Sequence, residues 1–364
     1  MVSSSHPSLT RRPWVGLEQR LLGRVGDAAL PPGSLVVIGF SGGPHSLALA
    51  ACLQRVADKA QHRLLALHID HALRDSSRQE MARAADLARS LDIPFRTHRL
   101  SGDLRRSHPG VGLEEAARRE RYWTFAEIAE TTGAAVVAVG HHQADQAETV
   151  LLHLGRGAGL RGLSGMADDR VLSVPWWVDD RPIREVRIWR PLLAETPTTL
   201  QRYLEQRGLV PVIDPSNDDL TVTRNQVRAQ IVPAMDAVFP DWAGSFERLA
   251  RIVRDDDAAL DQWSAEAANE VARDSGELSM ASLTRYPVAI QRRLVRRWLA
   301  TSGVRPLPPF ERVEAILHLA SGATAGRTIE IGEGWSVETR HGLLSVRHDR
   351  TATGHTPAPE TDPV

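Results

Sequence analysis

A short polar turn after an apolar segment has the composition of a phosphate-binding loop. The turn consists of Ser41, Gly42, Gly43, Pro44, His45 and Ser46. Glycines let the backbone approach a ligand closely, and the free N–H groups at the start of the helix that follows attract anions. The loop is not a Walker loop, which ends in Gly-Lys-Ser/Thr, because the chain's single lysine, Lys59, lies too far along. A strand–helix turn without a ligand is the alternative for this loop alone.

A second polar segment, residues 140–149, also closes an apolar segment and opens a helix. Asp145 and Glu148 are three residues apart, so both lie on one helical face and could bind an ammonium group or a metal ion. His141 and His142 suggest a metal site, although adjacent side chains point in different directions. Acids in a first turn also complement the helix dipole, and the residues alone favour that simpler explanation.

Several arginines have spacings that suit anion binding. Arg118 is four residues from both Glu114 and Tyr122, and the default interpretation is a solvated helix with ion pairs. Arg224 and Arg228 lie one helical turn apart and could clamp an anion together. The remaining basic candidates each have a solvated alternative and are Arg156, Arg161, Arg292, Arg293, Arg296 and Arg297.

The elements that must position these residues alternate between strand and helix. Apolar segments predict strands at 35–40, 63–70, 95–100 and 134–140. Helical spacing predicts helices at 14–29, 46–57, 76–91, 113–131 and 143–154. Strands that are apolar on both faces favour a parallel, Rossmann-like α/β sheet, in which ligands bind at the carboxyl ends of the strands.

The pattern changes after about residue 239. Residues 241–300 have mostly helical spacing, a break follows at 304–309, and short strands are expected at 328–331, 335–339 and 343–347. We therefore expect a smaller helical and α+β domain after the catalytic one. The expected division is a leader with the first helix at 1–30, a catalytic domain at 31–235, a second domain at 240–349 and a disordered tail at 350–364.

Composition excludes several classes of protein. The 364 residues carry a net charge of −1, which gives no sign of a nucleic-acid partner. The single Cys52 excludes a disulfide framework, a Cys-x-x-Cys pair and an iron–sulfur cluster held by this chain. No stretch approaches the ~18 consecutive apolar residues that span a membrane, and the Ser-rich start is not a secretory signal. A cytoplasmic protein is expected.

The motifs together resemble a known family. The turn at 41–46 is similar to the Ser-Gly-Gly-x-Asp-Ser loop of the PP-loop ATP pyrophosphatases, which cleave ATP between the α and β phosphates. This loop and six later segments follow one another in the order seen in tRNA(Ile)-lysidine synthases. The six segments are residues 68–74, 114–122, 141–149, 156–166, 190–193 and 214–228. The resemblance covers about residues 35–235 and is looser beyond them.

The resemblance implies a two-step reaction. ATP adenylates the C2 oxygen of the wobble cytidine in a tRNA(Ile) with a CAU anticodon, and free L-lysine then displaces AMP to give lysidine. Asp145 and Glu148 match the acids used for the lysine ammonium, with Asp145 and Arg118 in catalytic roles. Arg224, Asn225 and Arg228 match a substrate-binding motif at the edge of the site. The loop residues 41–46 would bind ATP, with Mg²⁺ expected alongside it.

Two positions depart from the family pattern. His45 stands where the loop carries the Asp that helps to hold Mg²⁺, and Ala144 stands where a second acid often precedes Asp145. Imidazole is a poor ligand for Mg²⁺, which prefers oxygen. These departures keep two alternatives open: a tRNA-binding relative with impaired catalysis, and another adenylating PP-loop enzyme. The sequence leaves the oligomeric state open.

Overall fold

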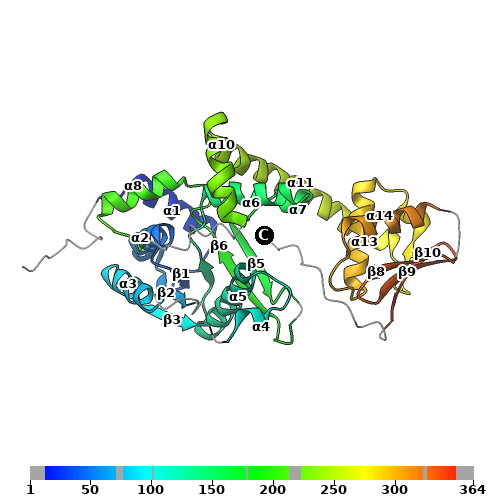
Figure 1. Ribbon diagram of the computed structural model, residues 1–364, viewed down its shortest axis with the longest axis horizontal. Coiled ribbons are helices and arrows are strands. Elements are labelled where there is room, and N and C mark those ends of the chain that lie inside the picture. The colour runs from blue at the N-terminus through cyan, green and yellow to red at the C-terminus, as the bar shows by residue number, and fades with distance from the viewer. Residues whose placement is uncertain are drawn as a thin grey trace, which may run out of the picture. The chain divides into compact units, whose positions relative to one another are not determined.

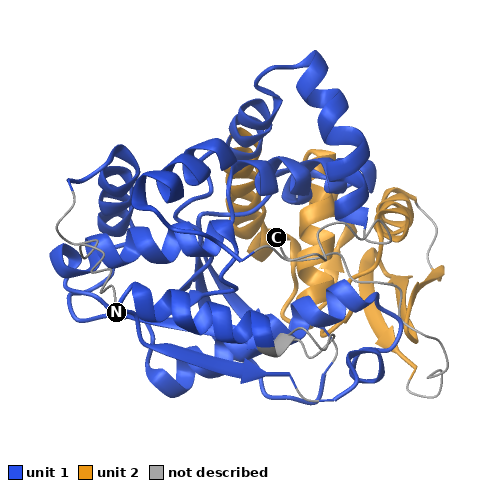
Figure 2. Cartoon of the chain, turned by 60° about the vertical axis from the view of Figure 1, so that its left-hand side comes forward, with its two compact units in different colours: residues 1–251, 363–364 blue, residues 252–362 orange. Residues whose placement is uncertain are grey.

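The chain divides into two compact units (Figure 2). The computed structural model describes residues 13–70, 77–100, 102–177, 179–212, 223–322 and 326–349. One unit comprises 1–251 with 363–364, the other comprises 252–362, and the boundary falls inside helix α11 (Trp242–Val271). The expected leader at 1–12, the motif around Asp214 and the expected tail at 350–364 lie outside the described residues. Among the described residues, no helix is long and apolar enough to cross a membrane.

The first unit is built on a six-stranded sheet (Figure 1). Its strands are β1 (Leu35–Gly39), β2 (Arg63–Asp70), β3 (Phe95–Arg99), β4 (Val136–Ala138), β5 (Asp169–Val174) and β6 (Arg184–Trp189). Their order is β3-β2-β1-β4-β6-β5, and every neighbouring pair is parallel except β5 with β6. The chain leaves β1 in one direction to β2 and returns on the other side at β4. Ligands of such sheets bind at this switch point.

Helices cover both faces of the sheet because the strand side chains alternate between two cores. Val36 and Ile38 of β1 pack into the core that α1 (Gly16–Asp27), α2 (Pro44–Ala60) and α8 (Pro197–Arg207) cover, whereas Val37 packs into the core that α5 (Leu113–Thr132) covers. The helices of this unit are α1 (Gly16–Asp27), α2 (Pro44–Ala60), α3 (Ser77–Ser90), α4 (Leu104–Ser107), α5 (Leu113–Thr132), α6 (Gln143–Gly155), α7 (Leu160–Leu163), α8 (Pro197–Arg207), α9 (Thr223–Gln226) and α10 (Val232–Val238). A π-helical turn, Val227–Ile231, joins α9 to α10.

The expectation of a parallel-sheet α/β fold is confirmed, with one antiparallel pair, β5 and β6, at the edge of the sheet. Strands β5 and β6 and helix α8 were not expected from the sequence. Strand β6 reads Arg-Glu-Val-Arg-Ile-Trp, and its charged residues hide the apolar alternation that marks a strand. Helix α2 begins two residues earlier than expected because Pro44 occupies its first turn, where no N–H is needed.

The second unit carries a four-stranded antiparallel sheet. Its strands are β7 (Leu278–Ser279), β8 (Thr328–Gly332), β9 (Trp335–Arg340) and β10 (Leu343–His348), in the order β7-β10-β9-β8. Its further helices are α12 (Met280–Leu283), α13 (Val288–Thr301) and α14 (Phe310–Ser321). Leu294 and Trp298 of α13 lie in one core with Ile316 of α14 and Val337 of β9.

Candidate active site

The polar turn lies at the carboxyl end of β1 and leads into α2. Gly42 has a φ of +79°, a conformation that glycine adopts without strain. Hydrogen bonds close the turn: the Gly43 amide donates to Ser41 Oγ at 3.2 Å, and Ser46 Oγ donates to the Gly43 carbonyl at 3.1 Å. The amides that open α2 have no intrahelical acceptor, so they are available to an anion.

Gly140 brings the loop after β4 against this turn. A Cβ at Gly140 would lie 2.9 Å from the carbonyl carbon and oxygen of His45, closer than real Cβ contacts allow. Only glycine lets the two backbones approach so closely. The start of α6 is thereby fixed beside the phosphate loop, and the two polar segments singled out in the sequence share one site.

The adjacent histidines at the start of α6 form hydrogen bonds to different residues. His142 is the N-cap residue: its Nδ1 accepts from the Asp145 amide at 3.3 Å, and its own amide donates to Asp145 Oδ2 at 3.1 Å. His141 Nδ1 instead accepts from the buried Arg190 at 3.2 Å. The expectation that adjacent side chains diverge is confirmed, and Asp145 both caps the helix and faces the site.

Two carboxylates of α6 meet two arginines that lie about 80 residues later in the chain. Arg228 donates to Glu148 Oε1 at 2.6 Å and to Asp145 Oδ1 at 2.9 Å. Arg224 donates to Thr149 Oγ1 at 2.8 Å, and its Nε lies 3.6 Å from Glu148 Oε2. Glu148 Oε2 and Arg224 Nε are buried and have no hydrogen-bond partner among the described residues. We refer to Asp145, Glu148, Arg224 and Arg228 as the open cluster.

The environment moves the pKa values of the two acids in opposite directions. Burial raises the pKa of Glu148, and Arg228 only partly offsets that effect. Burial also acts against ionisation of Asp145, but His142, His141 and the two arginines outweigh it, so the pKa of Asp145 is lowered. When the pKa values of two neighbouring acids differ in this way, one acid can bind a cation while the other accepts a proton.

Helix α5 presents further cations to the same region. The Arg118 guanidinium lies 5.1 Å from the Tyr122 ring centroid, and its side chain is 18% exposed. Arg121, one helical turn further along α5, is half-buried. Burial, followed by the nearby Arg118 and Arg224, lowers the pKa of Arg121 despite the opposing effect of Tyr122.

The sequence includes Arg121 and Arg190 in the motif segments 114–122 and 190–193 but gives neither residue an individual role. The helix segment 114–122 reads as a charged, solvated face, and only the tertiary structure turns part of it inward. The spacing Arg118–Arg121, one turn apart and next to an aromatic residue, is the only signal that could have found Arg121. Arg190 follows β6 and is 2% exposed. The charged sequence of β6 does not predict that the arginine after it is buried.

The other candidate residues differ in how far they are exposed. Asn225 is buried in α9 between Arg224 and Arg228. The Gly-rich segment is held at its end, where Gln146 binds the Met166 backbone through both its amide atoms, whereas its Arg156 and Arg161 are exposed. In the second unit, Arg292 pairs with Glu314, and Arg293 pairs with Asp257 and Asp261, whereas Arg297 is exposed. Arg296 donates to the Pro308 carbonyl.

The residues around the loop do not suit the Mg²⁺ ion that was expected with ATP. His45, His142 and Asp145 offer ligand atoms that all lie within 4.8 Å of one another. Two of the three donors are imidazole nitrogens, whereas Mg²⁺ takes oxygen ligands in octahedral geometry. This set of donors does not fit Mg²⁺.

A parallel sheet with a glycine-rich anion loop at its switch point, facing paired acids and arginines, defines an ATP pyrophosphatase of the PP-loop class. The PP-loop domain family matches residues 18–235, and the TilS substrate binding domain matches residues 278–348. A U34-tRNA thiolase from Methanococcus maripaludis shares this fold, with a TM-score of 0.54 at 16% identity over 65% of this chain and 78% of that one.

The most informative relatives carry one name. The tRNA(Ile)-lysidine synthase of Salinispora tropica is 35% identical over 87% of this chain and 91% of its own length. The proteins of that name from Symbiobacterium thermophilum (33% identical, 86% of this chain, 65% of the relative) and Thermobifida fusca (36%, 75% and 79%) are similarly related. The chain belongs to the tRNA(Ile)-lysidine synthase family.

Proposed function

We propose that this protein joins free L-lysine to C2 of the wobble cytidine in a tRNA(Ile) with a CAU anticodon, using ATP. The observation that carries the proposal is the open cluster, in which Glu148 is buried near Asp145. Only one of the two carboxylate oxygens of Glu148 has a hydrogen-bond partner among the described residues. Family membership supports the reaction as a whole. The roles of individual residues are inferred from their positions and charges.

The first step is adenylation. The C2 oxygen of cytosine attacks the α phosphorus of ATP, the bond from that phosphorus to the bridging oxygen breaks, and pyrophosphate leaves. The amides that open α2 and the Ser41 and Ser46 hydroxyls are placed to bind the phosphates. Arg118 and Arg121 supply positive charge where the transferred phosphate and the base become charged. The wobble base must leave its stack to reach this depth.

The second step is displacement by lysine. The ε-amine attacks C2, the bond from C2 to the adenylate oxygen breaks, and AMP leaves with that oxygen. Asp145, which stays ionised, is suited to bind the ammonium group, and Glu148, whose pKa is raised, is suited to accept its proton. Arg228 now occupies part of the space between the acids, so a lysine ammonium competes with its guanidinium for them.

Binding of the tRNA is assigned to both units. In the first unit, Arg224, Asn225 and Arg228 lie at the edge of the site, where substrate contacts are expected. In the second unit, the match to a substrate binding domain supports a role in holding the tRNA. Exposed arginines such as Arg297 would contact phosphates, which position a tRNA without reading its sequence.

Incorporation of radiolabelled lysine into purified tRNA(Ile) with a CAU anticodon tests the proposal. Label should enter the tRNA only when ATP is present, and pyrophosphate should be released in equal amount. A tRNA with a CAU anticodon that carries methionine is the matched control and should take up no label. Tight binding of the tRNA without release of pyrophosphate would instead establish the binding-only relative, which the replacement at His45 motivates.

A further inference from the structure

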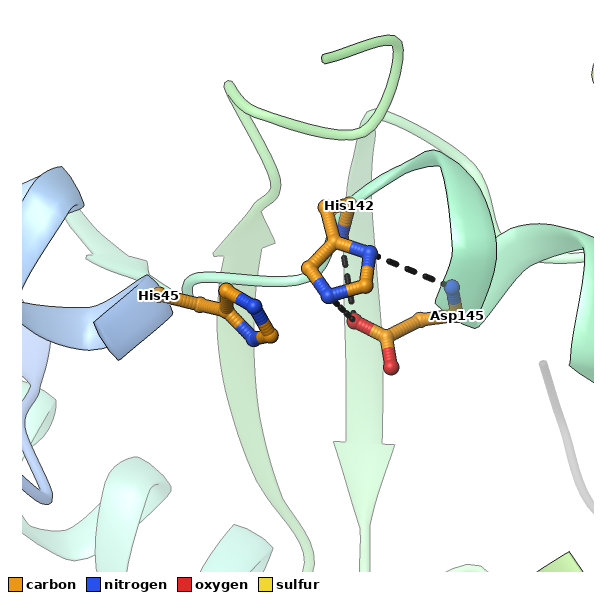
Figure 3. Close-up of side chains that lie close together, drawn as sticks. All are labelled: His45, His142 and Asp145. Carbon is orange, nitrogen blue, oxygen red and sulfur yellow. Dashed lines mark hydrogen bonds and ion pairs between the residues drawn. The ribbon is translucent and has the colours of Figure 1, made fainter. Parts of the chain in front are cut away.

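Two imidazoles and a carboxylate meet next to the phosphate loop, and the reaction described above gives a side-chain role only to the carboxylate, Asp145. His45 comes from the first turn of α2, while His142 and Asp145 come from the start of α6 (Figure 3). The two imidazole rings meet edge to face, with 3.9 Å between their centroids and an interplanar angle of 85°. The close backbone contact at Gly140 fixes this meeting of two helix starts.

One nitrogen in this group is buried without a hydrogen bond. His142 Nε2 has no hydrogen-bond partner among the described residues, and the His142 side chain is only 4% exposed. The nearest carboxylate oxygen, Asp145 Oδ2, is 3.5 Å away. Two ligands of a tetrahedral Zn²⁺, each at about 2.0–2.2 Å from the metal, lie about 3.3–3.5 Å apart. The spacing of His142 and Asp145 is therefore already that of a ligand pair.

We propose that His45, His142 and Asp145 form a binding site for a divalent cation of the Zn²⁺ type, with a fourth position left open. Two imidazoles and one carboxylate are a donor set that suits Zn²⁺ and Co²⁺ and disfavours Mg²⁺. All three ligand atoms lie within 4.8 Å of one another, so side-chain rotations that shorten these separations by up to about 1.5 Å complete the tetrahedral spacing. The site lies beside the amides that open α2.

The protonation states favour this cation. Burial is the main cause of a lowered pKa at both histidines, to about 4 for His45, so both rings are neutral at physiological pH and can act as ligands. Asp145 is ionised. Its Oδ1 accepts from Arg228, which leaves Oδ2 to face the two imidazoles.

Metal binding requires one local change. With His142 Nδ1 accepting from the Asp145 amide, the proton of the neutral ring lies on Nε2. A cation at Nε2 needs the tautomer with the proton on Nδ1, so the 3.3 Å capping bond is given up. The reciprocal bond from the His142 amide to Asp145 Oδ2, at 3.1 Å, can remain because a carboxylate oxygen has two lone pairs.

The test uses the full chain without a tag and stripped of metal. Binding of Co²⁺ is monitored by visible absorption, and binding of Zn²⁺ is measured by calorimetry. Neither measurement needs tRNA, lysine or ATP, so its outcome is independent of the proposed function. We expect one cation per chain with the strong visible bands of tetrahedral Co²⁺. Replacing His45→Ala should remove these bands and weaken Zn²⁺ binding by about 100-fold.

Because the chain has 14 histidines, a matched control is needed. His341→Asn changes an exposed histidine in the turn before β10, at a φ of +50° that asparagine tolerates, and should leave the titration unchanged. His45→Asp, which changes two imidazoles and one acid into one imidazole and two acids, should weaken Zn²⁺ and strengthen Mg²⁺ binding. Equal Zn²⁺ affinity in wild type and His45→Ala, with both folded by circular dichroism, would overturn the proposal.

Discussion

Two clusters in the first unit join carboxylates to arginines, and they differ in how completely the carboxylates are satisfied. Glu18 of α1 is fully buried, and Oε1 accepts from Arg207 at 2.6 Å, Tyr203 at 3.1 Å and Arg55 at 3.2 Å. Its Oε2 accepts from the Val15 amide at 3.1 Å. We refer to Glu18, Arg55, Tyr203 and Arg207 as the closed cluster.

The open cluster uses the same residue types with a different result. Glu148 keeps one oxygen without a hydrogen bond, and the side chains of Arg224 and Arg228 are 28% and 38% exposed, against 3% for Arg55 and Arg207. The closed cluster ties α1, α2 and α8 together, and both oxygens of its carboxylate are hydrogen-bonded within the protein. An arginine–carboxylate group is therefore a candidate site only where an acceptor and a path to solvent remain, which residue types alone do not reveal.

The largest effect is expected from opening the closed cluster. Glu18→Ala leaves two buried guanidinium groups without their acid, and breaking a buried pair in this way costs about 3–5 kcal/mol. Urea denaturation should show a free energy of unfolding lower by about that amount. Glu205→Ala, which removes an exposed acid of α8, is the control and should change stability by less than about 0.5 kcal/mol. A loss at Glu18 as small as the control's would mean that the cluster contributes little.

The second largest effect is expected in the open cluster, but on activity. Glu148→Gln removes the carboxylate that would accept the proton of the lysine ammonium, so kcat/KM for lysine should fall about 100-fold, equivalent to about 2.7 kcal/mol. Stability should change by less than about 1 kcal/mol, because the neighbouring arginines keep access to water. Steady-state incorporation at varied lysine and a parallel urea titration measure both quantities. A stability loss like that of Glu18→Ala, with activity per folded molecule retained, would remove the distinction between the clusters.

A third prediction concerns the backbone contact that shapes the open site. Gly140→Ala places a Cβ against the His45 carbonyl, so the loop or the start of α6 must move, and overpacking of this kind costs about 1–3 kcal/mol. Release of pyrophosphate should slow as well, because the phosphate loop is displaced. Gly155→Ala, at the end of α6 with nothing within 4 Å, is the matched control for both measurements. Equal behaviour of the two variants would show that the contact is not rigid.

The smallest effect is spectroscopic and compares Tyr203 of the closed cluster with Tyr122, which lies beside Arg118 and Arg190. In the closed cluster, burial raises the pKa of Tyr203, with Cys52 and Glu18 adding to it. Burial also opposes ionisation of Tyr122, but Arg118, Arg190 and Arg121 outweigh it and lower its pKa to about 8. The pKa of Tyr286 is raised by its hydrogen bond to Glu270. Of the three tyrosines, one should therefore ionise early, near pH 8.

Ultraviolet absorbance of tyrosinate follows this titration. The early third of the signal should disappear in Tyr122→Phe and persist in Tyr286→Phe. Because the folded pKa of Tyr122 lies below its ordinary value of 10.0, ionisation favours the folded state: the contribution is complete above pH 10 and is lost as pH falls through about 8. Wild type should therefore gain stability over Tyr122→Phe between pH 8 and pH 10. A single step near pH 10 for all three tyrosines would contradict the arrangement of the arginines.

The sequence predicts those features of the fold that depend on interactions between residues close together in the chain. The strand–turn–helix at 35–51 is predictable because apolar runs, glycines and a first-turn proline act within a few residues. The proximity of Asp145 and Glu148 follows from helical spacing in the same way. Their contact with Arg224 and Arg228 joins segments about 80 residues apart, and only the assembled sheet decides it.

The missed features have the same cause. Strand β5 pairs only with β6 at the edge of the sheet, and its half-exposed residues give too weak an apolar pattern to be recognised. Glu18 looks like an ordinary acid in the first turn of a helix, yet it is fully buried because Arg207 and Tyr203 reach it from α8. Burial of a charged side chain depends on partners distant in sequence. The spacing of residues within one helix does not reveal those partners.

The most direct test of the account separates the two chemical steps at Glu148. ATP–pyrophosphate exchange with the tRNA, measured without lysine, reports adenylation alone, and label from lysine reports the displacement. If the open cluster receives the lysine amine, Glu148→Gln should keep exchange close to the wild-type rate while incorporation falls about 100-fold. Equal loss of exchange and incorporation in the folded variant would show that Glu148 acts on ATP or the tRNA and would contradict the assignment of lysine to this cluster.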